Sequence, residues 1–224
     1  MVNITRAADL LEVGANGGGW TAPLGTSSPG DPAVQPLAPW TPLGAISEDG
    51  LTQGFDEDSQ SFTPWGFTSP IRTTITSSLR TFGLTVWETG RVVVQSLQYR
   101  VDSADLTPTA GLTSFAETAS PEPDRRAFWF VVLDGDSFQR GFYVPQGEIT
   151  ERSDVSHKQD EIPGFHWTTT PYPDEAGTTT CGVIKKKNGK KKFKCCPTIP
   201  AAANPDPTCA GIPSCCSTKV CGDG

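Results

Sequence analysis

Alternation of apolar and polar side chains is the clearest pattern in the chain, and it predicts strands. Over residues 71–87, Ile71, Thr73 and Ile75 would face one side of an extended segment, with threonine or arginine between them. Gly83 interrupts this segment and predicts a bulge or bend.

A second apolar segment predicts a central strand. Residues 127–133, AFWFVVL, are apolar at consecutive positions, which is typical of a strand buried on both faces. DGDS and then FQRGFYVP follow, so the segment predicts the first half of a hairpin. His166 and Trp167 belong to the last predicted strand of the body, and residues 102–126 are expected to form a loop. Together these segments give six to eight strands.

One short helix is predicted over residues 90–100, GRVVVQSLQYR, with Val92, Val93, Leu97 and Tyr99 toward the sheet. The β-branched triplet weakens this interpretation, because such residues have low helix propensity. The predicted fold is therefore all-β with one short helix, a β-sandwich or partly closed barrel.

Composition supports this class and adds an extended N-terminal segment. The 224 residues contain 23 Gly and 20 Pro, and residues 1–40 are so rich in both that we expect an extended arm, with Trp20 and Trp40 docked on a surface. The first residues have neither the basic opening nor the apolar stretch of a signal peptide, and no run approaches the about 18 apolar residues of a membrane span. We therefore expect a soluble protein made in the cytosol.

Charge and cysteine content both change near residue 180. Residues 1–180 carry 10 Lys and Arg against 23 Asp and Glu, and residues 181–224 carry 8 against 2, so the two parts have net charges of −13 and +6. All seven cysteines fall in the second part. We therefore predict three parts: the arm 1–40, a β-domain 41–180 and a basic Cys-rich module 181–224.

The C-terminal module is expected to begin with a hairpin. Asn188-Gly189 is a strong two-residue turn signal with lysines on both sides, and pairing around it places Cys181 opposite Cys196. A short segment with few apolar side chains needs staples, so up to three disulfides are predicted, with the connectivity open. The candidate cysteines are Cys181, Cys195, Cys196, Cys209, Cys215, Cys216 and Cys221. Zinc bound by Cys181, Cys195, Cys196 and Cys209 is the alternative, although their spacing fits standard zinc modules poorly.

An acidic stretch, residues 44–66, has three possible interpretations. A turn is expected at residues 48–50, Glu-Asp-Gly, and a second acidic group follows at Asp56, Glu57 and Asp58. The carboxylates could be a catalytic pair, alternating calcium ligands, or a surface that meets water, a channel or another subunit.

Recognisable catalytic and metal motifs are missing from the sequence. A calcium loop of the EF-hand type that started at Asp56 would have Ser61 where it needs Gly and Thr68 where it needs Glu. His157 and His166 lie in no nucleophile–base motif, and P-loop, G-x-S-x-G and H-E-x-x-H sequences do not occur. We predict no enzyme activity, no cofactor and no dedicated metal site.

PLGAISEDGL is followed by Trp65-Gly66, by a Thr-rich strand ending in LTVWETG, by a short helix, by YVPQGEITERSDV and by TTTPYPDEAG. The order of these motifs resembles the major tail tube protein of long-tailed, siphovirus-type bacteriophages. The strand over residues 71–87 is then the first candidate for the barrel-forming hairpin arm of this family. The resemblance covers about residues 40–180, and the ordered series is more specific than any single motif.

This resemblance implies a structural virion protein assembled in the host cytoplasm. Members of the family form hexameric rings whose hairpins join into a barrel, and the rings stack into a tube that passes the genome to the host. The implied partners are further copies of the chain and the tape measure, terminator and distal tail proteins, with no membrane partner. DNA would pass through without specific binding.

The acidic residues acquire a role in such a tube. An acidic wall would repel DNA, so Glu48, Asp49, Asp56, Glu57 and Asp58 are candidates for the lumen or an inter-ring surface. Solvated turns are the simpler alternative. The basic Cys-rich module would impede DNA inside the channel, so we expect it outside as a decoration or attachment element. Other hypotheses are a virion adhesin with a β scaffold, a single-ring tail terminator, and a β-sandwich hydrolase that uses Glu57.

Overall fold

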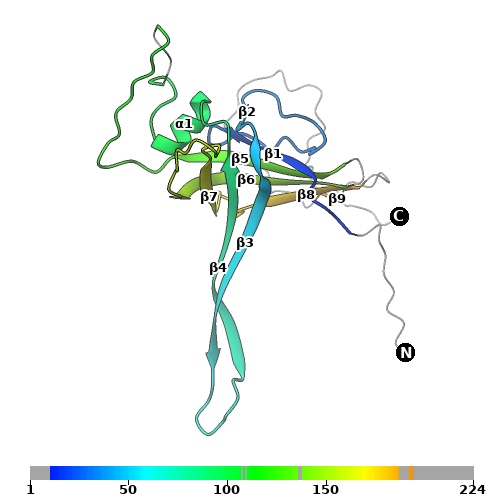
Figure 1. Cartoon of the computed structure of the whole chain (residues 1–224). Coiled ribbons are helices and arrows are strands. Elements are labelled where there is room, and N and C mark those ends of the chain that lie inside the picture. Colours follow the sequence, from blue (N-terminus) through cyan, green and yellow to red (C-terminus); the bar gives the residue numbers. More distant parts are fainter. Residues whose placement is uncertain (1–10, 107, 109, 136–137, 187–191, 194–224) are drawn as a thin grey trace.

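The alternating segments form the strands of one sheet, in a computed structural model that describes residues 11–106, 108, 110–135, 138–186 and 192–193 (Figure 1). One helix, α1 (Val92–Tyr99), lies between the fourth and fifth strands of this described part. The strands are β1 (Asn16–Ala22), β2 (Thr41–Pro42), β3 (Ile46–Phe62), β4 (Arg72–Val86), β5 (Arg125–Asp134), β6 (Phe138–Arg152), β7 (Phe165–Tyr172), β8 (Cys181–Lys186) and β9 (Lys192–Phe193).

All strand pairs in the sheet are antiparallel, and the main order is β2-β1-β5-β6-β7-β4-β3. The long strand β6 pairs with β8 through its first half and with β7 through its second half. Strands β2 and β3 are the two ends of this order, yet they follow each other in the chain. In the short connection between them, Leu43 N–H donates to the Gly19 carbonyl of β1 at 2.8 Å. The order still has two ends, so the sheet is not closed. The predicted all-β class with one short helix is confirmed.

Strand β5 is buried on both faces, as its sequence predicts. Phe128 and Phe130 contribute to a core cluster with Trp167, whereas Trp129 and Val131 contribute to a second cluster on the opposite face. Because side chains alternate along a strand, β5 supplies both cores at once. The hairpin formed by β5 and β6 is therefore the centre of the body.

Helix α1 covers the first of these cores. Val94 and Leu97 are buried in it, and Val93 and Tyr99 pack at its edge. The expectation that Val92 faces the sheet is wrong, since its side chain is 37% exposed. A helix of this length has room for one buried stripe only, and Val94 occupies it in place of Val92.

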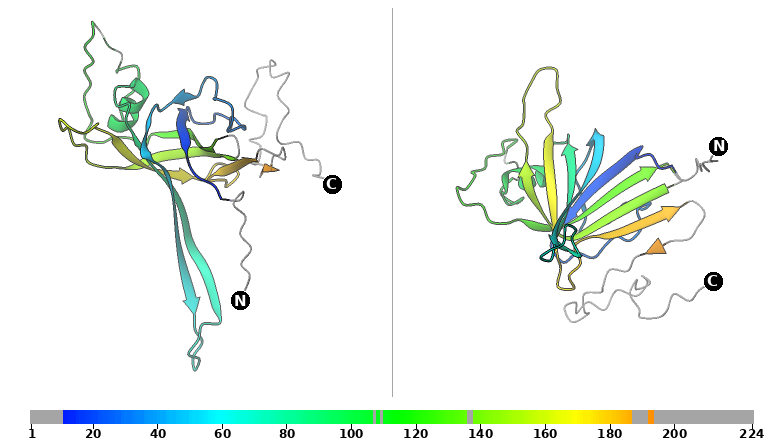
Figure 2. Two further views of the ribbon diagram at one scale, coloured as in Figure 1. Left: turned by 45° about the vertical axis from the view of Figure 1, so that its right-hand side comes forward. Right: turned by 90° about the horizontal axis from the view of Figure 1, so that it is seen from below.

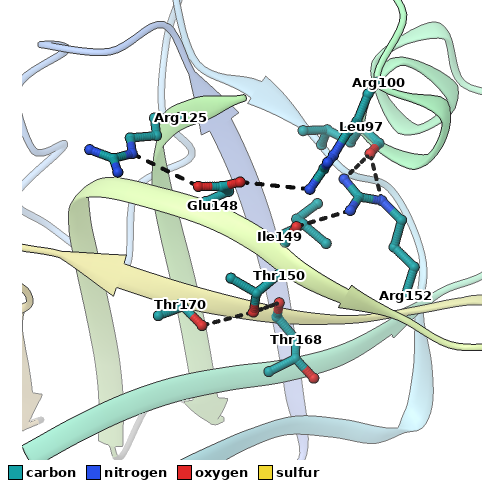
Figure 3. Close-up of polar contacts among 9 residues, drawn as sticks. All are labelled: Leu97, Arg100, Arg125, Glu148, Ile149, Thr150, Arg152, Thr168 and Thr170. Atoms are coloured by element: carbon teal, nitrogen blue, oxygen red, sulfur yellow. Dashed lines mark hydrogen bonds and ion pairs between the residues drawn. The ribbon is translucent and has the colours of Figure 1, made fainter. Parts of the chain in front are cut away.

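Arginine side chains fasten α1 to β6 (Figure 3). Arg152 donates to the Leu97 carbonyl from Nε and Nη2 at 3.2 and 2.7 Å, and from Nη1 to the Ile149 carbonyl at 2.9 Å. Burial, with the neighbouring Arg100, lowers the pKa of Arg152. Arg152 therefore satisfies a carbonyl at the helix C-terminus that has no partner inside the helix.

Two predicted features differ in the structure. Residues 48–50 do not form a hairpin turn but a bulge within β3, since the pairing moves from Ile46–Val86 directly to Leu51–Leu84. Gly83 pairs regularly with Thr52, so the bulge predicted there is wrong. The sequence signal was ambiguous because glycine at positive φ, as at Gly50 (69°), occurs in bulges as well as in turns.

Part of the predicted N-terminal arm belongs to the sheet. Strand β1, NGGGWTA, pairs with β5 along its whole length, although its glycines argue against a strand. They are needed for close approach: a Cβ on Gly17 would lie 2.5 Å from the Val131 carbonyl oxygen. Trp40 is buried beside Tyr143, as expected of a docked side chain, and Trp20 packs partly buried against the second core.

The connection from β1 to β2 is held against the second core. Tyr143 Oη donates to the Thr26 carbonyl at 2.6 Å, and Lys185 Nζ contacts Asp31 at 3.1 Å. Burial raises the pKa of Tyr143 to about 12, with Asp174 adding to the effect. The hydroxyl thus stays protonated and remains a donor over a wide pH range.

The sheet continues beyond residue 180, where the sequence predicts a new module. Strand β8 pairs with β6, and Cys181 and Val183 lie in the second core. Strand β8 pairs with β9, and Val183 lies opposite Phe193. A two-residue turn at 188–189 would pair position 183 with position 194, so the observed register differs from the predicted one by one residue. That turn and the other six cysteines lie outside the described residues, so the disulfide and zinc alternatives and the three-part division stay predictions.

The arginine contacts give a stability prediction. Arg152→Ala should lower the free energy of unfolding by about 2 kcal/mol, because three hydrogen bonds to a charged group are lost and the Leu97 carbonyl loses its partner. Arg140→Ala removes a more exposed pair with Glu12 and should cost less than about 1 kcal/mol. Urea unfolding at a protein concentration below any assembly measures both. Equal costs for the two variants would contradict this role of Arg152.

Candidate assembly surface: the arm formed by β3 and β4

Strands β3 and β4 form a long two-stranded arm that leaves the body (Figure 1). Within β4, only Phe82–Val86 also pairs with β7, whereas residues 72–81 pair with β3 alone. Side chains at 72–80 are all exposed. Most of the segment 71–87 therefore forms one strand of a long hairpin with β3, and its place in a barrel stays a prediction.

The two faces of the arm carry different carboxylates. A register shift leaves Thr76 unpaired, between the pairs Asp58–Ser77 and Ser59–Ile75. On the regular strand β3, Asp56 and Asp58 share one face and Glu57 lies on the other. The acidic triplet therefore cannot act as one cluster, because its members point to opposite sides.

Hydroxyl groups across the strands hold the carboxylates. Ser77 Oγ donates to Asp58 Oδ2 at 3.0 Å, and Ser78 Oγ donates to Glu57 Oε1 at 3.2 Å. On the Glu57 face, the Arg80 guanidinium lies 5.0 Å from the ring centre of Phe55. These cross-strand pairs stabilise the arm locally but bury little surface.

Large apolar side chains extend along the arm to its tip without being covered. Isolated two-stranded hairpins are only marginally stable in water, and exposed apolar surface of this extent marks an interaction site. The exposed residues are Phe55, Phe62, Trp65, Phe67, Ile71, Ile75 and Leu79. The arm is therefore a candidate interaction surface.

The other two acidic candidates lie apart from the triplet. Glu48 and Asp49 belong to the bulge at the base of the arm, where they line a groove of about 480 Å³ with Asp154, Asp160 and Glu161. The structure thus brings these five carboxylates together and separates them from Asp56 and Asp58. The sequence did not indicate the contribution of residues 154–161, which come from the connection between β6 and β7.

The histidines and carboxylates form no recognisable reaction centre in the described part of the chain. His166 Nδ1 lies 3.0 Å from Thr85 Oγ1, on the pair of strands β4 and β7, and His157 is exposed. Within the described ranges, no group of three or more His, Cys, Asp or Glu side chains is placed to hold a metal ion. In the same part of the chain, no helix has the length and apolar character that crossing a bilayer requires.

Sequence reasoning missed the importance of the tip of the arm. Residues 63–71 connect β3 to β4, and Trp65 within this connection is fully exposed. The signal was present, because Pro64-Trp65-Gly66 is a turn sequence that places a large aromatic residue at its corner.

Comparison with known proteins gives one family. A family model described as "Phage tail tube protein" matches residues 6–193, which is most of the chain and includes the whole sheet and the arm. No curated protein matches the sequence.

A shortened arm should leave the body intact. If residues 56–79 are removed and Phe55 is joined to Arg80 through Asn-Gly, the pair Phe55–Arg80 closes a two-residue hairpin. Since the removed residues contribute nothing to either core, the free energy of unfolding should change by less than about 1 kcal/mol. Urea unfolding and far-ultraviolet circular dichroism measure this. Loss of the folded state would show that the arm is part of the body.

Proposed function

Since the chain belongs to the phage tail tube proteins and is a structural subunit of the virion tail, we propose that its copies form hexameric rings that stack into a genome-delivery channel. The observation that carries the proposal is the exposed β3–β4 arm on a sheet with two open ends. Both features expose surface that other protein can cover. The proposal includes a long-tailed, siphovirus-type tail.

Ring formation would remove the exposed strand edges. Strand β3 is long, lies at one end of the sheet and pairs only with β4. Such an edge in a monomer is a template for uncontrolled aggregation. In a ring, one side of each subunit meets a different side of the next, and closure of the ring leaves no lateral edge free.

The acidic face of the arm suits a channel for DNA. Residues 1–180 have a net charge of −13, and Asp56 and Asp58 lie on one face of an exposed strand. We place this face toward the channel, where repeated carboxylates repel phosphates and keep the DNA from binding. Glu57, on the opposite face, and Glu48 and Asp49, at the base, would lie at contacts between subunits or rings.

The arrangement of rings in a tube also suggests where the partner proteins and the C-terminal module lie. The tube would meet the tape measure protein inside it and the terminator and distal tail proteins at its ends. The basic Cys-rich residues 181–224 would lie outside as a decoration or attachment element, since lysines inside the channel would hold the DNA.

Negative-stain electron microscopy of the purified full-length protein over a concentration series tests the assembly. We expect hollow tubes or stacked rings with six-fold symmetry above a threshold concentration, and the variant with the shortened arm should form neither long tubes nor stacks. Single particles at every concentration, or rings with another symmetry, would contradict the proposal.

Charge reversal tests the channel-facing acid. Asp58→Lys should increase retention of linear DNA on assembled tubes by at least about 10-fold at low salt, because every copy adds a cation to the channel, and added salt should abolish the retention. Glu57→Lys is the matched control on the opposite face and should retain no more DNA than the wild type. Equal retention by the two variants would contradict the orientation of the arm.

A further inference from the structure

The tip of the arm presents one tryptophan in a fixed geometry. Phe67 N–H donates to the Pro64 carbonyl at 3.1 Å, and Gly66 has a φ of 87°. Residues 64–67 therefore form a tight turn with Trp65 at its corner. Ile71 N–H closes the loop on the Phe62 carbonyl at 3.0 Å. Trp65 has 102% relative exposure, so its indole contacts almost nothing in its own chain. An exposed tryptophan on an ordered turn is a typical anchor of a protein interface.

A groove of suitable size lies at the other end of the molecule. Its volume is about 610 Å³, and it is formed by the segment after β1, the start of α1 and the residues just before β5. Leu24 and Val92 line it and are 52% and 37% exposed. The remaining apolar lining consists of Ala22, Pro23, Pro39 and Val93. This surface offers aliphatic and proline side chains to an aromatic ring.

Charged groups surround the apolar part of the groove. Asp102 and Asp124 lie on the lining with Arg125 and Arg126, and Arg126 Nε donates to Asp124 Oδ1 at 2.8 Å. An indole buried here would need an acceptor for its N–H, and a carboxylate at the groove supplies one. The groove therefore provides both parts of a tryptophan site, an apolar pocket and a polar acceptor.

The positions of tip and groove exclude an intramolecular contact. The arm extends from the body in one direction, whereas α1 and the connection from β1 to β2 lie on the opposite side of the body (Figure 1 and Figure 2, left). From Arg80 to Ile71, β4 spans about 30 Å at the rise of an extended strand. One copy can therefore reach the groove of a second copy placed farther along the direction of the arm.

We propose that Trp65 of each subunit inserts into the groove beside Leu24 and Val92 of a subunit in the adjacent ring. The inference rests on the proposed stacking of rings and names the contact that makes it. The two surfaces differ and lie at opposite ends, so the contact repeats without closing and generates a tube of open length. The direction of the arm then sets the direction of growth.

Substitutions separate stacking from ring formation. Trp65→Ala should raise the threshold concentration for tubes at least about 10-fold while single rings persist, since the indole is the main anchor. Val92→Asp should have the same effect by placing a carboxylate in the apolar pocket. Leu112→Asp is the matched control, because Leu112 is exposed but does not line the groove. Trp65→Ala tubes formed at the wild-type threshold would overturn the inference.

A photo-crosslink identifies the receiving site directly. p-Benzoylphenylalanine at position 65 of the full-length protein should, after irradiation of assembled tubes, yield a dimer whose cross-linked peptide contains residues 22–24, 39 or 92–93. A cross-link to any other segment would overturn the choice of groove while leaving the tube itself established. If the wild-type protein forms neither rings nor tubes, the proposed function fails as well, and this result is distinct from a misplaced cross-link.

Discussion

The burial of β5 on both faces is the constraint on which the rest of the fold depends. Phe128 and Phe130 require a cover on one side of the sheet, and Trp129 and Val131 require one on the other. Helix α1 supplies the first cover, and the segment that carries Trp40, together with β8, supplies the second. Strands β1 and β6 pair with β5 on its two edges, and β6 in turn pairs with β8, so β5 lies inside the sheet.

The same constraint explains why the arm is free for assembly. Both cores are complete without any residue between Phe55 and Leu79, so this segment is not required to fill either core. Trp65 and Ile75 on the arm therefore remain exposed in a single chain. The body supplies folding stability, and the arm is left as surface for the proposed association. This division allows a tube subunit to fold before it assembles.

Sequence predicted the elements that depend on local patterns. The alternation around Ile75 and the continuous apolar run at β5 identified the arm and the central hairpin, and the short helix was found despite its valines. Features set by distant pairing were not predictable. Strand β1 lies so close to β5 at Gly17 that a Cβ there would collide with the Val131 carbonyl, which no local pattern reveals. The register between β8 and β9 also differs by one residue from the register that the predicted turn would give. For the candidate site, the sequence identified the acidic residues but not their separation onto opposite faces, since this follows from the register of β3.

Charge and apolar surface on the arm act together to limit association to the correct partner. A long exposed hairpin with Phe55, Ile75 and Trp65 would aggregate if it were uncharged. Carboxylates at consecutive positions 56–58 place a negative charge on each face, so two arms that stack face to face repel each other. The tip from 63 to 71 carries no charge, and it alone can enter an apolar groove without desolvating a carboxylate. The distribution of charge along the arm thus favours insertion of the tip and pairing at the strand edge over stacking of arm faces, which is the selectivity that an ordered tube requires.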